Sequence, residues 1–186
     1  MRIVAGEFRG RPLASVGKGD PAAHLRPTTD RVREALFNML AGGRFGDPFD
    51  GTRVLDLFAG TGALGLEALS RGAAHVTLVD DGRKAQALIR KNIGLLGAGG
   101  RTRLLGCDAT RLPQAEAPCA LVFLDPPYGK ALGARALEAA LAQGWIAEGA
   151  LVVWEESTPQ FAVAGFELLD TRRYGDTHVT LLEKVD

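Results

Sequence analysis

Cysteine and histidine are scarce in this sequence, which has two cysteines and three histidines in 186 residues. Cys107 and Cys119 lie far apart with no CxxC pairing, and the histidines are scattered. A structural zinc site needs about four clustered ligands, so we expect no metal site. Both thiols are expected to stay reduced and to have a structural role.

Long hydrophobic runs are also missing. The longest apolar stretches are far shorter than a membrane span, and residues 1–4 do not lead into the apolar core of a signal peptide. The sequence therefore predicts a cytoplasmic protein that has no membrane partner.

An excess of charge of either sign is absent as well, since 22 basic and 22 acidic side chains give a formal net charge of zero. A balanced charge argues against a protein that coats nucleic acid without selectivity. The balance is uneven along the chain, because residues 1–35 carry seven basic and four acidic side chains. We therefore expect a locally basic N-terminal segment, residues 1–35, on an otherwise neutral protein.

The sequence does contain enough apolar material for one core, with 46% hydrophobic residues in a chain of 186. We expect a single domain over residues 1–186, made of an N-terminal extension (1–45) and a core (46–186). The extension is predicted to begin with a short hairpin over residues 1–13 and a Gly- and Pro-rich loop over 14–27.

A helix is predicted after this loop. Thr28 or Thr29 can cap it, and the apolar residues that follow recur at helical spacing. The recurring positions are Val32, Ala35, Leu36, Met39 and Leu40. On this pattern the side chains of Arg31 and Arg33 lie off the buried stripe.

From residue 53 onward, short apolar runs alternate with amphipathic segments. The runs predict strands at 54–57, 76–79, 102–105, 121–124, 151–154, 166–173 and 177–184. Helices are predicted at 63–70, 83–96 and 132–143. Such alternation indicates a parallel sheet covered on both faces, and the last two strands flank a turn typical of a hairpin. The predicted fold class is α/β and Rossmann-like, with a mostly parallel seven-stranded sheet and a C-terminal antiparallel hairpin.

A glycine-rich turn follows the first of these strands. Residues 60–65 have the spacing GxGxxG, and Asp80 stands twenty residues past Gly60. This pattern is typical of dinucleotide binding, so an NAD-dependent oxidoreductase is one alternative. A dinucleotide places its pyrophosphate at the helix N-terminus, where the carboxylate of Asp56 would repel it. S-adenosylmethionine (SAM) carries an ammonium and a sulfonium group, so Asp56 favours SAM, which it can contact directly or through water.

Acidic residues stand at the ends of the next two predicted strands. Asp80 can accept hydrogen bonds from both ribose hydroxyl groups, a role that passes to Asp81 if the register shifts by one. Asp108, after the third strand, can accept a hydrogen bond from the adenine amino group. Open α/β sheets bind ligands at the carboxyl ends of their strands, so these acids are predicted to form one nucleoside site.

A second motif, Asp125-Pro126-Pro127-Tyr128, follows the fourth predicted strand. The Asp125 carboxylate and the Pro126 carbonyl can each accept one N–H of an exocyclic amino group, which favours the tetrahedral nitrogen that attacks a methyl sulfonium. The two prolines restrict the backbone and aim that carbonyl in advance. Tyr128 offers a face on which a base can stack. The motif therefore predicts methyl transfer to an exocyclic nitrogen of a nucleic-acid base.

Longer blocks of the sequence resemble one family. Residues 6–11 (GEFRGR), 26–38 (RPTTDRVREALFN) and 58–72 (FAGTGALGLEALSRG) are similar to signatures of the RsmD family. The Asp-Pro-Pro-Tyr run resembles the motif of amino methyltransferases that act on adenine N6, cytosine N4 or guanine N2. The resemblance covers nearly the whole chain. It implies the Rossmann-like fold of SAM-dependent methyltransferases and methylation of guanine N2 in 16S (small-subunit) ribosomal RNA.

The resemblance also implies roles for single positions. The implied cofactor contacts are Asp56, Gly60, Gly62, Asp80 and Asp108, and Thr28, Phe58 and Asp81 are further cofactor-binding candidates. The implied contacts with the target base are Asp125, Pro126 and Tyr128, and Pro127 is a further candidate of the catalytic segment. The block 26–33 is expected to close over the methionine end of the cofactor and to meet RNA. Asp80 is followed by a second acid where the family pattern has an apolar residue, which leaves the ribose ligand open between Asp80 and Asp81.

The expected partner is small-subunit ribosomal RNA or an assembling 30S particle, bound by a monomer. The arginines expected to face RNA are Arg9, Arg11, Arg26, Arg31 and Arg33, with Arg172 and Arg173 as secondary candidates. Within the same chemistry the alternative is an adenine-N6 methyltransferase that acts on DNA or RNA. A non-catalytic RNA-binding module is a further alternative, which the intact Asp125-Pro126-Pro127-Tyr128 motif disfavours.

Overall fold

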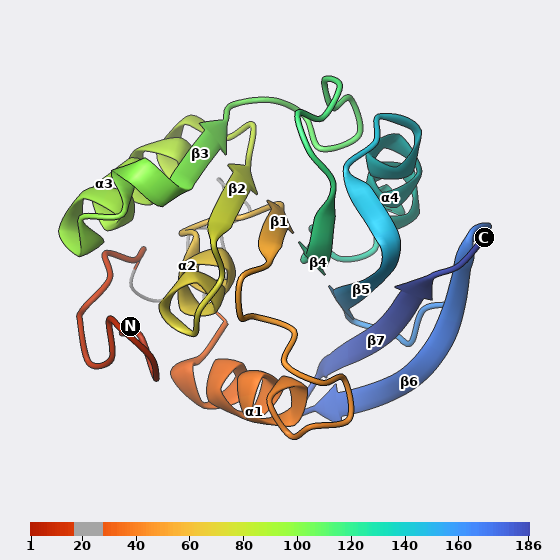
Figure 1. The fold of residues 1–186 in the computed structure, drawn as a ribbon, viewed down its shortest axis with the longest axis horizontal. Helices are drawn as coiled ribbons and strands as arrows, with labels where there is room; N and C mark the ends of the chain where they lie inside the picture. Colours follow the sequence, from red (N-terminus) through yellow and green to blue (C-terminus); the bar gives the residue numbers. More distant parts are fainter. Residues whose placement is uncertain (17–27) are drawn as a thin grey trace.

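One seven-stranded sheet organises the protein (Figure 1). The computed structural model describes residues 1–16 and 28–186. The strands are β1 (Arg53–Leu57), β2 (His75–Val79), β3 (Thr102–Leu105), β4 (Cys119–Leu124), β5 (Ile146–Glu156), β6 (Phe166–Tyr174) and β7 (Thr177–Lys184). The helices are α1 (Asp30–Leu40), α2 (Ala63–Ser70), α3 (Arg83–Leu96) and α4 (Leu132–Ala142), with a short 3-10 turn η2 (Gly99–Arg101). The strand order across the sheet is β3-β2-β1-β4-β5-β7-β6.

The parallel part of the sheet is buried on both faces. Strands β1 to β5 are parallel, and successive side chains of a strand point to opposite faces. On β1, Val54 packs in one apolar cluster with residues of α1, α2 and α3, whereas Leu55 and Leu57 pack in a second cluster with residues of α4. The predicted α/β class is therefore confirmed, and the continuous apolar runs reflect burial on two sides.

The C-terminal hairpin is also confirmed. Strand β7 pairs antiparallel with both β5 and β6, and Tyr174 pairs with Thr177 at the end of the hairpin. The hairpin extends the sheet beyond β5 and leaves β6 at the edge (Figure 1).

The N-terminal arm (residues 1–16) is less regular than a hairpin. Arg2 and Pro12 form an isolated antiparallel bridge, and the Ile3 N–H donates to the Arg11 carbonyl at 3.0 Å. The two ends of the segment therefore pair as predicted, while no continuous ladder forms among the described residues. The predicted loop 14–27 lies largely outside the described residues, since 17–27 are not among them.

Helix α1 begins where predicted, but its buried face differs. Thr29 is the N-cap, and its Oγ1 accepts the Val32 N–H at 3.2 Å. The fully buried side chains of the helix are Arg33, Leu36, Phe37 and Leu40. The prediction that Arg33 lies off the buried stripe is therefore wrong. The stripe is rotated by one residue because Phe37 stacks on Phe49, with ring centroids 5.5 Å apart.

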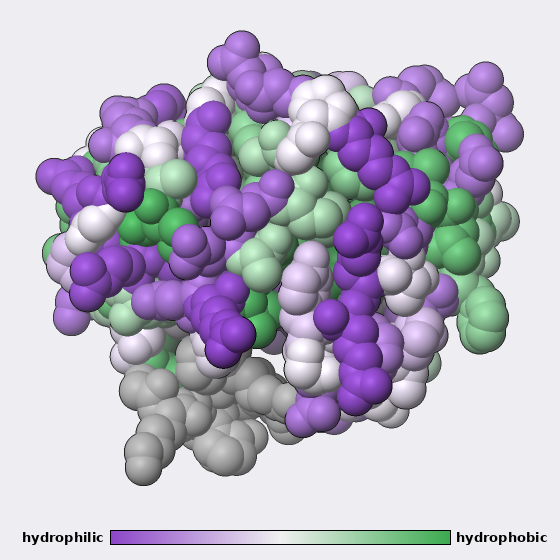
Figure 2. Space-filling model, turned by 90° about the horizontal axis from the view of Figure 1, so that it is seen from below, coloured by the Kyte–Doolittle hydropathy of each residue, from purple (hydrophilic) through white to green (hydrophobic). Residues whose placement is uncertain are grey.

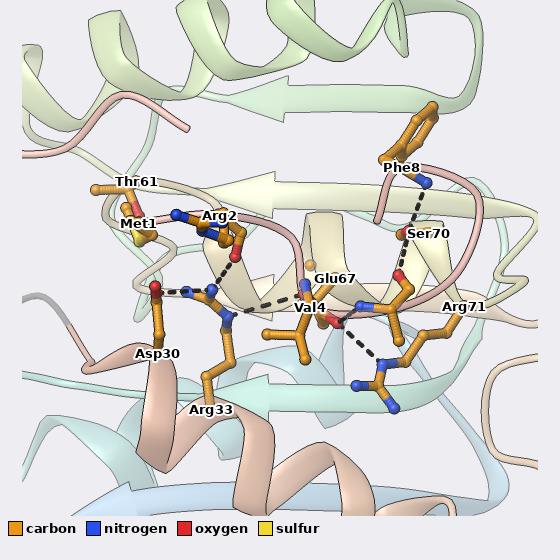
Figure 3. A network of polar contacts seen from close by, with 12 residues as sticks. Met1, Arg2, Val4, Phe8, Asp30, Arg33, Thr61, Glu67, Ser70 and Arg71 are labelled. Atoms are coloured by element: carbon orange, nitrogen blue, oxygen red, sulfur yellow. Dashed lines mark hydrogen bonds and ion pairs between the residues drawn. The ribbon is translucent and has the colours of Figure 1, made fainter. Parts of the chain in front are cut away.

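The charge of Arg33 is compensated inside the protein by Glu67 of α2 (Figure 3). Glu67 is fully buried, and its two carboxylate oxygens accept the N–H groups of Val4 and Ala5 at 2.9 and 3.1 Å. Arg71 donates to the same carboxylate at 3.0 Å, and Arg33 Nε lies 3.8 Å from it. Glu67 thus joins α1, α2 and the N-terminal arm.

Arg33 also contacts the N-terminal arm and the first residue of α1. Its guanidinium donates to the carbonyl of Arg2 and, at 3.0 Å, to the carboxylate of Asp30. A buried guanidinium needs several acceptors, and the arm supplies one of them with its backbone. The arm and the helix are therefore fixed to each other by polar contacts rather than by sheet pairing.

The arm also approaches α2 too closely for a side chain at one position. Gly6 has φ +84°, and a Cβ built there would lie 1.9 Å from the carbonyl oxygen of Ser70. The hydroxyl of Ser70 accepts the Phe8 N–H at 2.9 Å and donates to the Ala5 carbonyl at 2.6 Å. Gly6 in the resemblance block 6–11 is thus explained by close packing.

A buried carboxyl group connects β1 to α2. Asp56 is 1% exposed, and its Oδ2 accepts the Gly65 N–H at 2.9 Å. A Cβ at position 65 would lie 2.9 Å from that oxygen, so glycine permits the contact. Burial raises the pKa of Asp56 to about 8, with smaller contributions in the same direction from Asp125 and Asp80.

The surface seen from below carries hydrophilic residues throughout, with apolar residues in separate groups between them (Figure 2). Large hydrophobic side chains that are exposed include Leu95, Phe161 and Leu168. None of the helices in the described ranges is both long and apolar enough to cross a membrane.

Replacing Glu67 by glutamine should destabilise the protein strongly. Breaking a buried ion pair by removing one partner typically costs about 3–5 kcal/mol, because the other charge stays buried without compensation. Urea unfolding of Glu67→Gln measures the loss. The control is Glu7→Gln in the same arm, since Glu7 is exposed and pairs with exposed Arg101, and such pairs contribute at most about 1 kcal/mol. Equal effects of the two changes would contradict the network.

Replacing Asp56 by asparagine should flatten the dependence of stability on pH. The folded state favours the protonated carboxyl group, so stability is lost as pH rises from the ordinary pKa of 3.8 to about 8. The slope for one such group is about 1.4 kcal/mol per pH unit. Urea unfolding of wild type and Asp56→Asn at mildly acidic and mildly alkaline pH compares the slopes. The exposed control Asp176→Asn should keep the wild-type slope. An unchanged slope in Asp56→Asn would show that Asp56 is ionised in the fold.

Candidate active site at the carboxyl ends of the strands

A cavity of about 450 Å³ opens at the carboxyl ends of the parallel strands. Its position follows from the register: Leu57 pairs with Val79 on one side and with Leu124 on the other, and Leu124 pairs with Trp154. The next residues along β2, β4 and β5 therefore stand at one level. They are Asp80, Asp125 and Glu155, and all three line the cavity.

The lining of this cavity is strongly acidic. The carboxyl groups that line it are those of Asp80, Asp81, Asp108, Asp125 and Glu155. Among the described lining residues, Lys130 is the one basic side chain. Acidic groups outnumber the one lysine in this concave site, which favours a positively charged ligand over a phosphate. No group of three or more histidine, cysteine, aspartate or glutamate side chains in residues 1–16 and 28–186 is arranged to hold a metal ion.

The glycine-rich loop after β1 is tied to β2 by its backbone. The Gly60 N–H donates to Asp80 Oδ2 at 2.9 Å, and the Ala59 N–H donates to the Val79 carbonyl at 2.9 Å. Phe58 lines the cavity with φ +58°, a left-handed conformation that is uncommon outside glycine and often marks a functional site. The loop is thus held in one shape, with the Gly60 amide already occupied by a carboxylate.

Asp56 does not reach the cavity. It is buried beneath the first turn of α2, where it accepts the Gly65 N–H, and it is not among the lining residues. The side chain points to the α2 face of the sheet, so the contact of Asp56 with a cofactor, directly or through water, stays a prediction. Gly62 also lies behind the lining, whereas Gly60 belongs to it. The carboxyl group of Asp56 still occupies the helix end at which a pyrophosphate would bind.

The acids expected to hold a nucleoside line the cavity together. Asp80 accepts N–H groups of Gly60 and Gly82 at 2.9 Å each, which leaves further lone pairs on both oxygens. Asp81 is exposed beside it, so the structure keeps both as candidates for ribose hydroxyls. Asp108 accepts the N–H and hydroxyl of Thr110 at 2.8 Å. These bonds lower the pKa of Asp108, which is therefore an ionised acceptor at neutral pH.

The Asp125-Pro126-Pro127-Tyr128 segment lines the same cavity as the loop after β1. Pro126 is buried, whereas Pro127 and Tyr128 are half-buried. The phenol oxygen of Tyr128 lies 3.2 Å from Thr177 Oγ1, a contact that connects the motif to the start of β7. Rigid backbone and an anchored ring place a carboxylate, a carbonyl and an aromatic face on one side of the cavity.

Residues of the N-terminal arm and the start of α1 also line the cavity. Met1, Thr28, Thr29 and Val32 belong to the lining, in agreement with the expectation that part of block 26–33 lies over the site. The Arg33–Glu67 network described above anchors these residues. The cavity is thus shared between the sheet and the N-terminal extension.

The arginines expected to face RNA are divided by the structure. Arg9 and Arg31 are exposed, and Arg11 is exposed while its guanidinium donates to the Leu96 carbonyl at 3.4 Å. Arg33 is fully buried and so is not available to RNA in this conformation. Arg26 lies outside the described residues. The exposed secondary candidates are Arg172 and Arg173.

One lining acid was missed by the sequence analysis. Glu155 is 2% exposed at the end of β5, one residue beyond the predicted strand 151–154. The signal that identified Asp125, an acid directly after a buried apolar strand, is equally present here. Applied to every strand, that rule would have found Glu155.

Comparison with known proteins places the chain in a family. A family profile described as "Conserved hypothetical protein 95" matches residues 1–183. The chain is 41% identical over 156 residues to Ribosomal RNA small subunit methyltransferase D of Escherichia coli, which covers 83% of this chain and 74% of that protein. It is 42% identical over 132 residues to the Putative rRNA methyltransferase YlbH of Bacillus subtilis, with 69% and 67% covered.

A solved structure agrees with these matches over the full length. The putative methyltransferase yhhF from Escherichia coli superposes with a TM-score of 0.83 at 37% identity, and the alignment covers 100% of this chain and 98% of that one. The family expected from the sequence blocks is therefore confirmed: the chain belongs to the RsmD family.

Proposed function

We propose that this protein transfers a methyl group from SAM to the exocyclic N2 of a guanine in small-subunit ribosomal RNA. One observation carries the proposal: the Asp125-Pro126-Pro127-Tyr128 segment and the glycine-rich loop line one acidic cavity. The names of two relatives, which refer to ribosomal RNA methyltransferases, support the same substrate class.

The residues of the cavity fit SAM better than a dinucleotide. Five lining acids suit a ligand that carries sulfonium and ammonium charges. The Gly60 and Gly65 N–H groups, which a pyrophosphate would need, already donate to Asp80 and Asp56. Asp108 would accept the adenine amino group, and Asp80 or Asp81 would accept the ribose hydroxyls. SAM supplies an electrophilic methyl group on a positively charged sulfur.

The chain's own part in the reaction centres on Asp125. A guanine amino group is a poor nucleophile because its lone pair is delocalised into the ring. The Asp125 carboxylate and the Pro126 carbonyl would each accept one of its N–H bonds and favour a tetrahedral nitrogen. On methyl transfer the nitrogen would bond to the methyl carbon while the sulfur keeps the electron pair of the broken carbon–sulfur bond, and Asp125 or water would take the extra proton from the nitrogen. Preorganised acceptors of this kind are usually the largest contribution to catalysis.

Tyr128 would hold the base in place. Stacking on an aromatic ring is worth about 1–3 kcal/mol per base, which offsets part of the cost of pulling a base out of its stack. The contact with Thr177 fixes the ring before the base arrives. Exposed Arg9 and Arg31 would meet phosphates of a folded RNA or an assembling 30S particle, which a protein recognises largely by shape.

The function is tested by incubation with methyl-labelled SAM and three acceptors: small subunits that lack the modification, protein-free ribosomal RNA and DNA. The RNA is then digested and the labelled nucleoside identified. We expect N2-methylguanosine from ribosomal RNA or subunits. N6-methyladenine would overturn the assigned base while retaining the chemistry, and no transfer to any acceptor would overturn the function.

Replacing Asp125 by alanine should slow methyl transfer at least about a hundredfold, as the loss of one preorganised polar group typically does. The dissociation constant for SAM should change far less, because Asp80, Asp81 and Asp108 remain. Single-turnover kinetics and calorimetry separate the two quantities. Asp50→Ala, on an exposed loop away from the cavity, is the control. Near-normal turnover of Asp125→Ala would remove Asp125 from the mechanism.

A further inference from the structure

Glu155 is a buried acid placed beside the reacting group. Trp154 pairs with Leu124 across the parallel strands β5 and β4, so Glu155 and Asp125 are neighbours at the ends of these strands. Glu155 lines the cavity together with Asp125 and Tyr128, although it is only 2% exposed. Two carboxyl groups therefore stand side by side on the part of the cavity assigned to the target base.

One oxygen of the Glu155 carboxyl group is left without a partner within the described fold. This oxygen, Oε1, is buried and has no hydrogen-bond partner among the described residues. Adjacent Glu156 differs, since its Oε1 accepts the N–H of Ser157 at 3.0 Å. Burying an unpaired polar atom costs free energy, so the unpartnered oxygen of Glu155 calls for an explanation. A ligand in the cavity can supply the missing partner.

The chemistry of the base edge indicates what that partner is. Guanine presents two adjacent donors on one edge, the ring N1–H and the exocyclic amino group. Adenine instead presents an N1 acceptor beside its amino group. Two neighbouring carboxyl groups match the two donors of guanine and oppose the lone pair of adenine N1.

We propose that Glu155 accepts a hydrogen bond from N1–H of the target guanine, beside the amino group held by Asp125, and so selects guanine over adenine. This inference rests on the proposed function and adds a specificity-determining residue to it. The aromatic face of Tyr128 would set the plane in which both carboxyl groups meet the base edge.

The charge state of Glu155 depends on what surrounds it. Burial raises its pKa well above the ordinary value of 4.5, and the nearby carboxyl groups of Asp125 and Asp56 raise it further. The Val179 of β7 that pairs with it contributes no charge, and Lys130 is the basic side chain that lines the same cavity. A cationic ligand bound among these acids lowers the pKa and favours the ionised acceptor. Guanine should therefore bind better after the cofactor.

The test uses small-subunit RNA in which the target guanine is replaced by 2-aminopurine. This base keeps the amino group but has an N1 acceptor without hydrogen. Wild type should methylate guanine faster by about tenfold to a hundredfold, because the analogue leaves Glu155 without its partner. In Glu155→Gln the amide N–H can donate to N1 of the analogue, so the ratio of the two rates should fall towards one or invert.

Glu156→Gln is the matched control, since it removes a neighbouring buried carboxyl group that does not line the cavity. Glu156→Gln should keep the wild-type ratio of the rates on guanine and on 2-aminopurine. Because 2-aminopurine also lacks the O6 atom of guanine, this control carries any effect of that loss. Equal rates of wild type on the two bases would overturn the inference without any variant. An unchanged ratio in folded Glu155→Gln would also overturn it while the proposed function stands. Absence of transfer to guanine by wild type would instead refute the function itself.

Discussion

The parallel register of β2, β1, β4 and β5 is the constraint on which the site depends. It brings Asp80, Asp125 and Glu155 to one level at the carboxyl end of the sheet, although they are far apart in the sequence. Like charges so close together are unfavourable, and burial adds to the cost for Glu155. A positively charged ligand relieves this repulsion, so the same arrangement that costs stability in the free protein provides affinity.

A buried ion network gives the cavity its second wall. Glu67 accepts backbone N–H groups of the N-terminal arm, while Arg33 donates to the carbonyl of Arg2. These contacts hold the start of α1 and Met1 where they line the cavity. Buried ion pairs add little net stability compared with apolar packing, but removing one partner is costly. We interpret the network as a device that fixes the position of the extension.

The sequence predicted the fold well because burial on two faces produces continuous apolar runs that periodicity detects. It also identified Asp125, which directly follows a predicted strand, and Asp108, which stands three residues after the end of one. Which face of α1 is buried was harder to predict. The burial of Arg33 makes sense only with its partner Glu67, which is distant in the sequence. The burial of the Asp56 side chain against α2 was not foreseen, because it follows only when the alternation of side chains along β1 is combined with the position of α2. Glu155 was missed because the rule that identified Asp125, an acid directly after a buried apolar run, was not applied to the strand predicted at 151–154.

The central claim is that an acidic cavity at the strand ends binds a cationic nucleoside cofactor. Calorimetric titration of the protein with SAM, its demethylated product and NAD tests it most directly. The account predicts saturable binding of SAM and of the product, and no binding of NAD. Replacing Asp108 by alanine should change the heat of SAM binding. Binding of NAD without binding of SAM would contradict the account, because it would mean that the glycine-rich loop holds a pyrophosphate despite the carboxyl groups around it.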